Sequence, residues 1–553
     1  MPSESLLPKP HTLGISEEKA HQISRIDTEV GRTRDDITTL LRKCADLNRK
    51  RNSFLLPVNL PTELLTIIFE FSCSPVDEKP PFSTIIGRDF WQISYQPMDS
   101  CSVVPGPLHL SRVCSRWREA SLNTPQLWDN IQLIVTRRHA KKQAALLRYW
   151  LASAGQRPLT VSLVQGNNAE DDSDMTTYDI PTAVIDALLP YSNQLFILDL
   201  FMTTSWESAF VQLGKNVPIL TSLTISPAFA SEDDPLEEIY FFALAPQLEN
   251  VTLSSYSIPA VALPLVQIKS FITDNMDEEA PYEIFRICPN LLHFKLDIRL
   301  DAPEWTVFTD SQRHDKLETL ELLVQTDEDV SVLLDRLTLP ALRSFTLEVT
   351  DESPVMMLIQ PFLARSACAL AILNLHCFTM PEDELISCLK SLPMLRALKL
   401  VNSRQMGRIY QNVLDSMNPR KQQISEKNNE CLVPHLESFC YSGKFSPSLH
   451  ALVEFAVDRW DNCDVDLPDD HRPPSGTNMP VVRLRSLTFM TDWKRLESNP
   501  GIVGVLRRLR KEGMKVEIVD EFGFCPGGPP LSRTLIKKLG LSEAEIEAMS
   551  MIR

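Results

Sequence analysis

A recurring L-x-x-L-x-L pattern constrains the fold of this chain more than any other feature of its 553 residues. Start-to-start spacings of 25, 28, 20, 23, 26, 25, 28 and 25 residues separate the consecutive copies, and two outlying copies follow after 41 and 48 residues. The copies open at Leu195, Leu220, Leu248, Ile268, Leu291, Leu317, Leu342, Leu370, Leu395, Leu436 and Leu484. Self-similarity at a nearly fixed period is typical of a repeat architecture, in which each unit stacks on its neighbours.

Each copy of the pattern predicts a strand, because alternate residues of a strand face the same side and the leucines then share one buried face. Apolar residues at helical spacing between strands, such as Leu385, Ile386 and Leu389, predict a helix before the next strand. A proline stands two places before six of the copies, where the connecting segment ends: Pro218, Pro246, Pro289, Pro340, Pro393 and Pro434. The period resembles that of leucine-rich repeats, which implies an irregular α/β solenoid with parallel strands on the concave face and helices or loops on the convex face.

Polar residues lie between the leucines of the predicted strands and face the opposite, concave side of the sheet. They carry no strong charge of a single sign, and simple solvation is the alternative explanation for any one of them. The candidate target-binding residues on this surface are Asn250, His293, Lys295, Glu321, Asn374 and Lys399.

The N-terminal region contains an amphipathic helix. Alternating steps of three and four place one stripe on it: Ile23, Ile26, Val30, Thr33, Ile37, Leu40, Cys44 and Leu47. The stripe spans about three and a half heptads, which is close to the lower limit for a coiled coil. We therefore expect packing against the next domain, with self-association as the alternative.

Two further apolar segments follow this helix. Pro57 and Pro61 end it, and residues 62–71 are too apolar all round for a surface helix, so burial on two sides is predicted and one side can be another protein. A helix is predicted again from Leu110 through Trp117 to Ala120. Between the two, residues 72–107 hold six prolines without a helical period and predict a long surface insertion.

The sequence LPTELLTIIF at residues 60–69 resembles the opening of the F-box, and LSRVCSRWR at 110–118 resembles its closing helix. With TPQLW at 124–128 and WLASAGQRPL at 150–159, the chain is similar to large fungal F-box families. In such proteins the F-box binds an SKP-family adaptor, which bridges to a cullin that carries the ubiquitin-transfer machinery. The resemblance implies that an adaptor face is formed or supported by Leu60, Pro61, Leu64, Leu65, Ile68, Val113 and Trp117.

The predicted fold class is α+β, a small all-α F-box region followed by the leucine-rich-repeat solenoid. We expect a disordered stretch at 1–20, the amphipathic helix within 21–55, the F-box at 56–130 and a linker helix with a first strand at 131–165. The solenoid is predicted at 166–490 with loops at 418–433 and 461–480. A C-terminal cap is predicted at 491–553, and its last helix, at 542–552, is opened by Ser542 and Glu545 as a capping box.

Catalytic, cofactor and metal motifs are not found in the sequence. It contains no GxxxxGK[ST], GxGxxG, HExxH or GxSxG, and Cys431 with His435 is most simply a chance pair. The net charge of −17 disfavours nucleic-acid binding, and no apolar run reaches the length of a membrane span. The start of the chain does not resemble a secretory signal, and twelve cysteines without a CxxC pair predict buried, reduced thiols. We expect residence in the cytoplasm, the nucleus or both.

By resemblance, the chain would be the substrate-recognition subunit of an SCF-type ubiquitin ligase, with no catalytic activity of its own. The alternative is a leucine-rich-repeat interaction scaffold without ligase association, in which the F-box-like helices only cap the repeats. An enzyme of unrecognised type is a third possibility. The second hypothesis requires the apolar residues of 56–130 to be buried on the first repeats.

Overall fold

The structure is a computed structural model. It describes residues 17–52, 54, 60–73, 106–136, 139–165, 182–201, 210, 211, 213–226, 242–254, 262–274, 280–298, 311–351, 355–377, 381–401, 408, 409, 411–424, 431–445, 449–461, 481–491, 496 and 498–520. Most of the predicted insertion at 72–107, the loop at 461–480 and the helix at 542–552 lie outside these residues. The chain forms two compact units, of which the smaller comprises Met1–Lys79, Met98–Asp129 and Ala152–Arg157.

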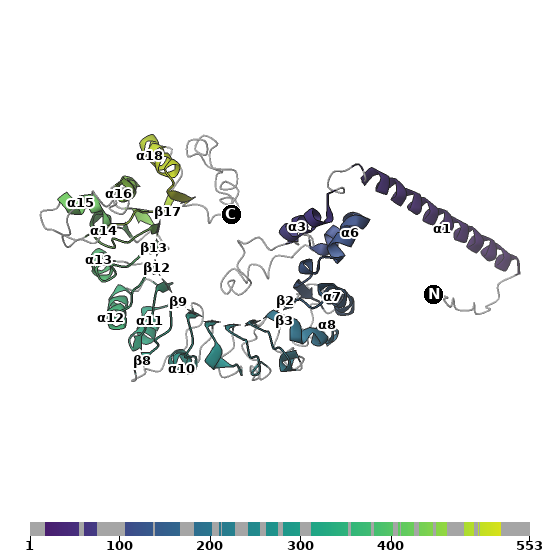
Figure 1. Ribbon diagram of the computed structural model, residues 1–553, viewed down its shortest axis with the longest axis horizontal. Coiled ribbons are helices and arrows are strands. Elements are labelled where there is room, and N and C mark those ends of the chain that lie inside the picture. Colours follow the sequence, from purple (N-terminus) through teal and green to yellow (C-terminus); the bar gives the residue numbers. More distant parts are fainter. Residues whose placement is uncertain are drawn as a thin grey trace. The chain divides into compact units, whose positions relative to one another are not determined.

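One 14-stranded sheet organises the larger unit, and its strands lie side by side in the order in which the chain makes them (Figure 1). Every neighbouring pair in this sheet is parallel. The strands are β1 (Asn130–Val135), β2 (Leu159–Gln165), β3 (Leu195–Phe201), β4 (Ser222–Ser226), β5 (Asn250–Leu253), β6 (Ser270–Thr273), β7 (His293–Asp297), β9 (Thr319–Val324), β11 (Ser344–Val349), β12 (Ile372–His376), β13 (Ala397–Val401), β15 (Ser438–Ser442), β17 (Ser486–Thr491) and β18 (Lys515–Asp520). The predicted mixed α/β fold with parallel strands is confirmed.

Each copy of the leucine pattern supplies one strand of this sheet, the two outlying copies included. The register aligns the leucines from strand to strand, as in Leu320 opposite Phe345, Phe345 opposite Leu373 and Leu373 opposite Leu398. These side chains are buried. Because a slip of one residue would move every leucine to the other face, the apolar pattern fixes the register.

The prolines before the strands lie in tight turns. In each turn the amide of the leucine that opens the pattern donates to the carbonyl three residues earlier, as from Leu395 to Leu392 (3.2 Å) and from Leu342 to Leu339 (3.2 Å). Pro393 and Pro340 occupy the position after the acceptor, where the fixed φ of proline suits a turn and its missing N–H breaks no bond. The proline thus sets the entry into each of these strands.

Helices and short 3-10 turns connect the strands. The helices are α8 (Thr182–Leu188), α10 (Ala280–Ile287), α11 (Asp327–Leu334), α12 (Met356–Ser366), α13 (Glu382–Lys390), α14 (Gln411–Met417), α15 (Pro419–Ile424), α16 (Leu449–Asp461) and α18 (Pro500–Lys511). In Figure 1, α11, α12 and α13 follow one another along the same side of the sheet. Between β3 and β6 much of the connecting chain lies outside the described residues. The parts that are described include two 3-10 turns, η6 (Leu213–Lys215) and η8 (Leu265–Gln267), and Phe210 is helical, so the predicted helix in every unit stays a prediction there. Pro264 is the N-cap of η8, and proline disfavours extension of the helix toward the residues before it.

Six strands of this unit have no counterpart in the sequence prediction. Strands β1 and β18 extend the sheet at both ends without the leucine pattern. Two small parallel pairs flank the sheet: β8 (Gln312–Arg313) with β10 (Leu337–Thr338), and β14 (Arg408–Ile409) with β16 (Lys444–Phe445).

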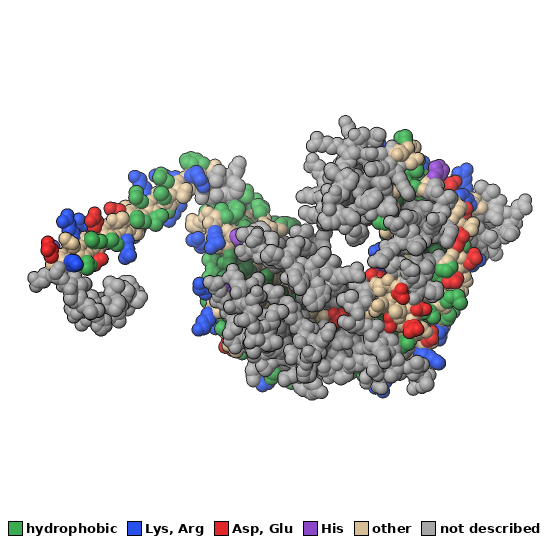
Figure 2. Space-filling model, turned by 180° about the vertical axis from the view of Figure 1, so that it is seen from behind, with side chains coloured by type: hydrophobic (Ala, Val, Ile, Leu, Met, Phe, Trp, Pro, Cys, Tyr) green, Lys and Arg blue, Asp and Glu red, His purple; other side chains and the backbone are tan. Residues whose placement is uncertain are grey.

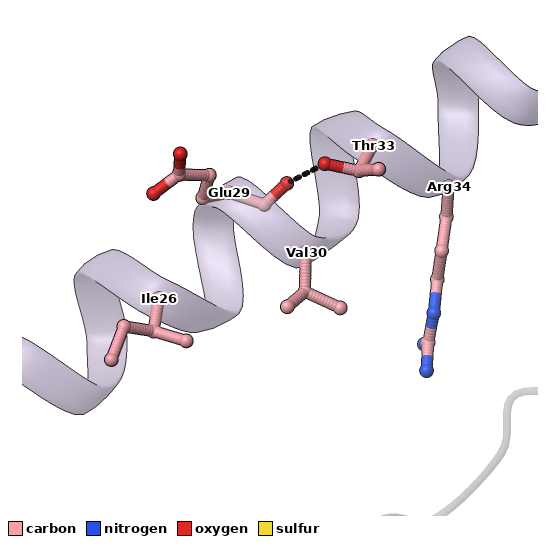
Figure 3. Close-up of a pocket in the computed structure, with 5 residues that line it drawn as sticks. All are labelled: Ile26, Glu29, Val30, Thr33 and Arg34. Carbon is pink, nitrogen blue, oxygen red and sulfur yellow. Dashed lines mark hydrogen bonds between the residues drawn. The ribbon is translucent and has the colours of Figure 1, made fainter.

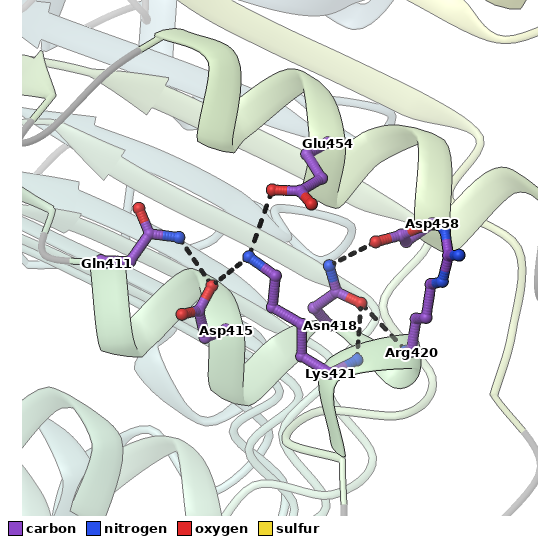
Figure 4. A network of polar contacts seen from close by, with 7 residues as sticks. All are labelled: Gln411, Asp415, Asn418, Arg420, Lys421, Glu454 and Asp458. Atoms are coloured by element: carbon purple, nitrogen blue, oxygen red, sulfur yellow. Dashed lines mark hydrogen bonds and ion pairs between the residues drawn. The ribbon is translucent and has the colours of Figure 1, made fainter. Parts of the chain in front are cut away.

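The predicted loop at 418–433 is wrong in its first half, where α15 begins. Asn418 caps this helix, because its Oδ1 accepts hydrogen bonds from the amides of Arg420 (3.0 Å) and Lys421 (3.3 Å). Its Nδ2 donates to Asp458 (2.8 Å) on α16, and the Asn418 side chain is buried (Figure 4). Pro419 at the first helical position completes a standard N-terminus.

Lys421 ties α15 to its neighbours on both sides. Its Nζ donates to Asp415 (2.8 Å) on α14 and to Glu454 (3.2 Å) on α16, as Figure 4 shows. Burial lowers the pKa of Lys421, but the hydrogen bonds with these two carboxylates outweigh it and raise that pKa above its ordinary value. A polar stretch is therefore ordered here by side-chain contacts and not by an apolar core.

The smaller unit contains α1 (Glu17–Asn52), α3 (Thr62–Cys73), α5 (Pro107–Val113), α6 (Ser115–Leu122) and the 3-10 turn η2 (Pro125–Leu127). The single helix predicted from Leu110 to Ala120 is wrong: it is broken at Cys114, whose backbone is extended (φ −158°, ψ 171°). The Cys114 thiol accepts a hydrogen bond from the Trp117 amide (3.4 Å) and so caps α6. The helical spacing of the apolar residues continues across the break, which is why it was not visible in the sequence.

The linker helix α7 (Ala140–Ala154) ends at Gly155, close to the predicted bounds. Gly155 adopts φ 67°, in the left-handed region that glycine enters without strain. A glycine in this conformation is a common way for a helix to end.

Candidate protein-docking surface

An exposed apolar stripe on α3 is the most prominent candidate site in the smaller unit. Leu64, Ile67, Ile68 and Phe71 are 47%, 47%, 46% and 81% exposed. They are spaced i, i+3, i+4 and i+7, which places them on one face of the helix. Large aliphatic and aromatic side chains gathered on one exposed face are typical of a protein-protein interface.

The opposite face of α3 packs inside the unit. Leu65 and Phe69 are buried, and the Phe69 ring meets the Trp117 ring edge-on with centroids 5.0 Å apart. Trp128 is also buried, and its Nε1 donates to the Ser121 carbonyl (2.7 Å). These contacts hold α3 against α6 and present the exposed stripe on a rigid support.

The segment before α3 is fixed as well. Arg116 on α6 donates a hydrogen bond to the Leu60 carbonyl, and the Leu65 amide donates to the Pro61 carbonyl (3.1 Å). Pro61 itself is exposed and Leu60 is half-buried. The backbone at the start of α3 is thus held by both α6 and the first turn of α3 itself.

The residues expected at an adaptor face fall into two groups. The exposed group consists of Pro61, Leu64, Ile68 and Val113. Leu65 is buried, and Trp117 is half-buried against Phe69, so these two can only support such a face.

Sequence reasoning missed Ile67 and Phe71 as members of the exposed stripe. The i, i+3, i+4, i+7 spacing from Leu64 to Phe71 was the available signal. It was hidden because Leu65 and Phe69 made the helix apolar on every side.

The candidate target-binding residues form two adjacent rows on the polar face of the large sheet. Asn250 is in register with Ser270, which is in register with His293. The second row crosses five strands, and it consists of Lys295, Glu321, Thr346, Asn374 and Lys399. Five of the six predicted residues therefore lie in one continuous region, which consists of His293, Lys295, Glu321, Asn374 and Lys399. Asn250 lies in the same row as His293, two strands away.

Hydrogen bonds and ion pairs order these rows. The His293 ring lies 3.1 Å from Ser270 Oγ through Nδ1 and 3.4 Å from Glu321 Oε1 through Nε2. Asn374 Nδ2 donates to Thr346 Oγ1 (3.0 Å). The contact with His293 holds the pKa of Glu321 below its ordinary value against the opposing effect of burial, and the charges of His293 and Lys295 lower it further.

A second His–Glu pair lies on the same sheet and was not singled out from the sequence. His376 Nδ1 is 3.3 Å from Glu348 Oε2, and the two residues are in register on neighbouring strands. Each follows the last leucine of its pattern, which was the only available signal. Paired polar groups of this kind suit the recognition of polar surface on a partner.

Three buried cysteines of the large sheet and its helices, Cys288, Cys377 and Cys388, are unsuited to act as nucleophiles. Burial raises the pKa of Cys288 to about 12 and of Cys388 to about 11, and burial raises the pKa of Cys377 to about 12 with the Glu348 charge adding to the effect. A thiol with a raised pKa is a poor nucleophile because the reactive species is the thiolate. These three match the predicted buried thiols, whereas Cys44 is exposed.

We expect a maleimide at pH 8 to leave Cys288, Cys377 and Cys388 unmodified in the native protein until denaturant is added. Mass spectrometry of proteolytic fragments checks this site by site. Labelling of Cys388 in the native protein at the rate measured in denaturant would contradict the burial.

The same shifts give a pH dependence of stability. The folded state favours the neutral thiols, so their contribution is complete below pH 9.0, the ordinary cysteine value, and is lost as the pH rises toward 11 to 12.

Within the described residues, no group of three or more His, Cys, Asp or Glu side chains is arranged to hold a metal ion. None of the described helices is both long and apolar enough to cross a membrane. In known proteins, neither a family model nor a curated sequence matches this chain. The fold and the surface define the class of protein as a mixed α/β protein on one long parallel sheet, with an exposed apolar helix face in a separate small unit.

Proposed function

We propose that the chain is the substrate-recognition subunit of an SCF-type ubiquitin ligase. An F-box within residues 56–130 docks on an SKP-family adaptor, and a leucine-rich-repeat solenoid binds the target protein. The observation that carries the proposal is the exposed stripe of α3, in which four large apolar side chains are 46–81% exposed. Moving such a side chain from full exposure to full burial contributes roughly 1.5 to 3 kcal/mol, and each of these four contributes in proportion to the part that is still exposed, so the stripe can anchor a partner.

The support behind the stripe favours a docking role. Interfaces draw most of their affinity from a few anchors held in place before binding, since ordering them at the time of binding costs free energy. Phe69 and Trp117 hold α3, and Arg116 holds the backbone at Leu60. The F-box resemblance of residues 60–69 gives this surface its proposed partner.

The scaffold hypothesis requires the apolar side chains of the F-box-like helices to be buried against the first repeats, where the helices would act only as a cap. Leu64, Ile67, Ile68 and Phe71 are exposed instead. Within the smaller unit this exposed face suits a partner protein, which supports the proposal of a ligase subunit. The target is a protein whose surface offers both hydrogen-bonding and charged groups, because Lys295, Glu321 and Asn374 share one row on the sheet.

The experiment is a pull-down of a purified SKP-family adaptor by the intact protein. We expect the adaptor to be retained, and we expect Pro61→Ala combined with Leu64→Ala to reduce retention strongly. Both side chains are exposed, so the double variant should fold as the parent does. Failure of the intact protein to bind, or undiminished retention by the variant, would count against the proposal and in favour of the scaffold.

A further inference from the structure

The 36-residue helix α1 carries an apolar stripe that is exposed throughout. Ile26, Ile37, Leu40 and Leu47 are 59%, 51%, 61% and 58% exposed, and Figure 2 shows hydrophobic side chains along the helix surface. Packing against the next domain, expected from the sequence, is not made by the described residues. Helices in proteins gain most of their stability from packing an apolar face, and Gly31 in the helix interior weakens α1 further. A partner is therefore needed.

The stripe has the heptad pattern of a two-stranded coiled coil. Its a positions are Ile23, Val30, Ile37 and Cys44, and its d positions are Ile26, Thr33, Leu40 and Leu47. Mainly β-branched residues at a, with leucine at two of the d positions, favour a parallel dimer. The hydroxyl of Thr33 donates to the Glu29 carbonyl (2.9 Å), so this residue does not need a polar partner across the seam.

A hollow on α1 has the shape that such a partner requires. It is lined by Ile26, Glu29, Val30, Thr33 and Arg34 (Figure 3). The first four are spaced i, i+3, i+4 and i+7, which is the set of four residues that forms a hole for one knob of a facing helix. In a parallel dimer in register, the knob is Val30 of the second copy.

The charges beside the stripe distinguish the orientation. In a parallel dimer, Glu29 at g meets Arg34 at e of the other copy, and symmetry makes this pair twice. The other g to e pairs are Gln22 with Asp27, Asp36 with Leu41 and Lys43 with Asn48, none of which is a like-charge pair. An antiparallel dimer that keeps the stripe aligned would pair Glu29 with Lys43, but it would also bring the two Arg34 side chains together and the two Asp36 side chains together.

We propose that α1 joins two copies of this chain in a parallel, in-register coiled coil. We assign a second copy of this chain as the partner of the stripe, because the a and d side chains of one copy fit the holes of the other and Glu29 of one copy meets Arg34 of the other. The inference does not depend on the ligase proposal. Its consequence is a bivalent molecule, whose two sheets bind a multivalent target more tightly than either alone.

Sedimentation equilibrium of the intact protein tests the dimer. We expect a mass of twice 62.6 kDa at micromolar concentration. Glu29→Arg is expected to weaken the dimer by about 10-fold through repulsion with Arg34, and Glu29→Arg with Arg34→Glu is expected to restore it. Arg42→Glu, which lies outside the a, d, e and g positions, is the matched control. A monomer at all concentrations, or a swap that fails to restore association, would overturn the proposal.

A short bismaleimide tests the orientation. In the parallel dimer the two Cys44 side chains share one layer, so we expect a covalent dimer that is absent in Cys44→Ser. In the antiparallel arrangement Cys44 faces Ile26. A non-covalent dimer that yields no Cys44-dependent product would therefore contradict the parallel geometry.

Discussion

Replacing Arg459 with methionine is expected to lower the local free energy of unfolding around α16 by about 4 kcal/mol. Arg459 is fully buried, and its guanidinium donates to a ring of backbone carbonyls: Met417 (2.9 Å), Leu432 (2.9 Å), Val433 (3.0 Å) and Pro434 (3.2 Å). Methionine fills the space but leaves these acceptors without donors in an interior from which water is excluded.

Three of these carbonyls, those of Leu432, Val433 and Pro434, belong to the turn that leads into β15, and the Met417 carbonyl lies at the end of α14. Val433 in this turn has φ 44°, a left-handed conformation that is strained for a β-branched residue and persists only when its surroundings hold it. Burial lowers the pKa of Arg459 below its ordinary value, and the contact with Cys431 offsets only part of this effect. Arg459→Lys is expected to fail as well, because an ammonium cannot reproduce the planar fork that reaches several carbonyls at once.

Amide hydrogen exchange measures this effect where it occurs, since the units of a long parallel sheet can open locally without unfolding the whole chain. We expect faster exchange in α16 and β15 and little change in β4 to β7. Arg396→Met is the matched control, because Arg396 is largely exposed and lies 3.9 Å from Glu437, an ion pair worth less than about 1 kcal/mol. Unchanged exchange in Arg459→Met would show that these hydrogen bonds contribute nothing.

The second large effect is expected in binding and not in stability. Ile68→Asp combined with Phe71→Asp should lower the affinity for an SKP-family adaptor by at least about 100-fold. The lost burial of two apolar side chains and the placing of two carboxylates in the interface together cost roughly 3 kcal/mol or more. Both side chains are exposed, so the unfolding midpoint should stay near that of the parent. Isothermal titration with the purified adaptor and thermal unfolding check the two halves of this expectation.

Two further variants serve as controls for this experiment. Met357→Asp introduces the same charge on an exposed apolar residue of α12 and should leave adaptor affinity unchanged. Phe69→Ala truncates a buried ring and is expected to cost about 3 to 5 kcal/mol of stability. Affinity that survives the Ile68 and Phe71 substitutions would place the adaptor contact elsewhere or remove it.

The strands of the large sheet could be predicted because their leucines obey two strong local rules at once. Alternation places Leu320 and Leu322 on one face, and burial of that face fixes the register with Phe345 and Leu347. Strands β1 and β18 were missed because they alternate without the leucine spacing. The single repeated motif therefore located the sheet but not its two ends.

The wrong predictions at 418–433 and at Cys114 have a common physical origin. In both places the local structure is decided by a contact with a residue far away in the sequence or by the backbone of a single residue. Polar composition suggested a loop at 418–433, although Asn418 followed by proline is a helix start that also needs Asp458 to be ordered. At Cys114 one extended residue breaks a helix without disturbing its apolar spacing.

The docking stripe was only half predictable for a similar reason. The sequence shows that residues 62–71 are apolar on every side, but only tertiary packing decides which side is covered. Phe69 faces Trp117, a residue far away in the sequence, and this contact leaves Ile67 and Phe71 outside. The rows on the sheet were easier, because parallel register follows from the repeat itself.

The most direct test of the account is the hydrogen-exchange footprint of an SKP-family adaptor on the intact protein. We expect adaptor binding to slow exchange in residues 60–73, where Leu64 and Ile68 lie, and to leave the strands from β7 to β13 unchanged. Protection confined to the sheet, or no change in α3 at saturating adaptor, would contradict the assignment of α3 as the docking helix.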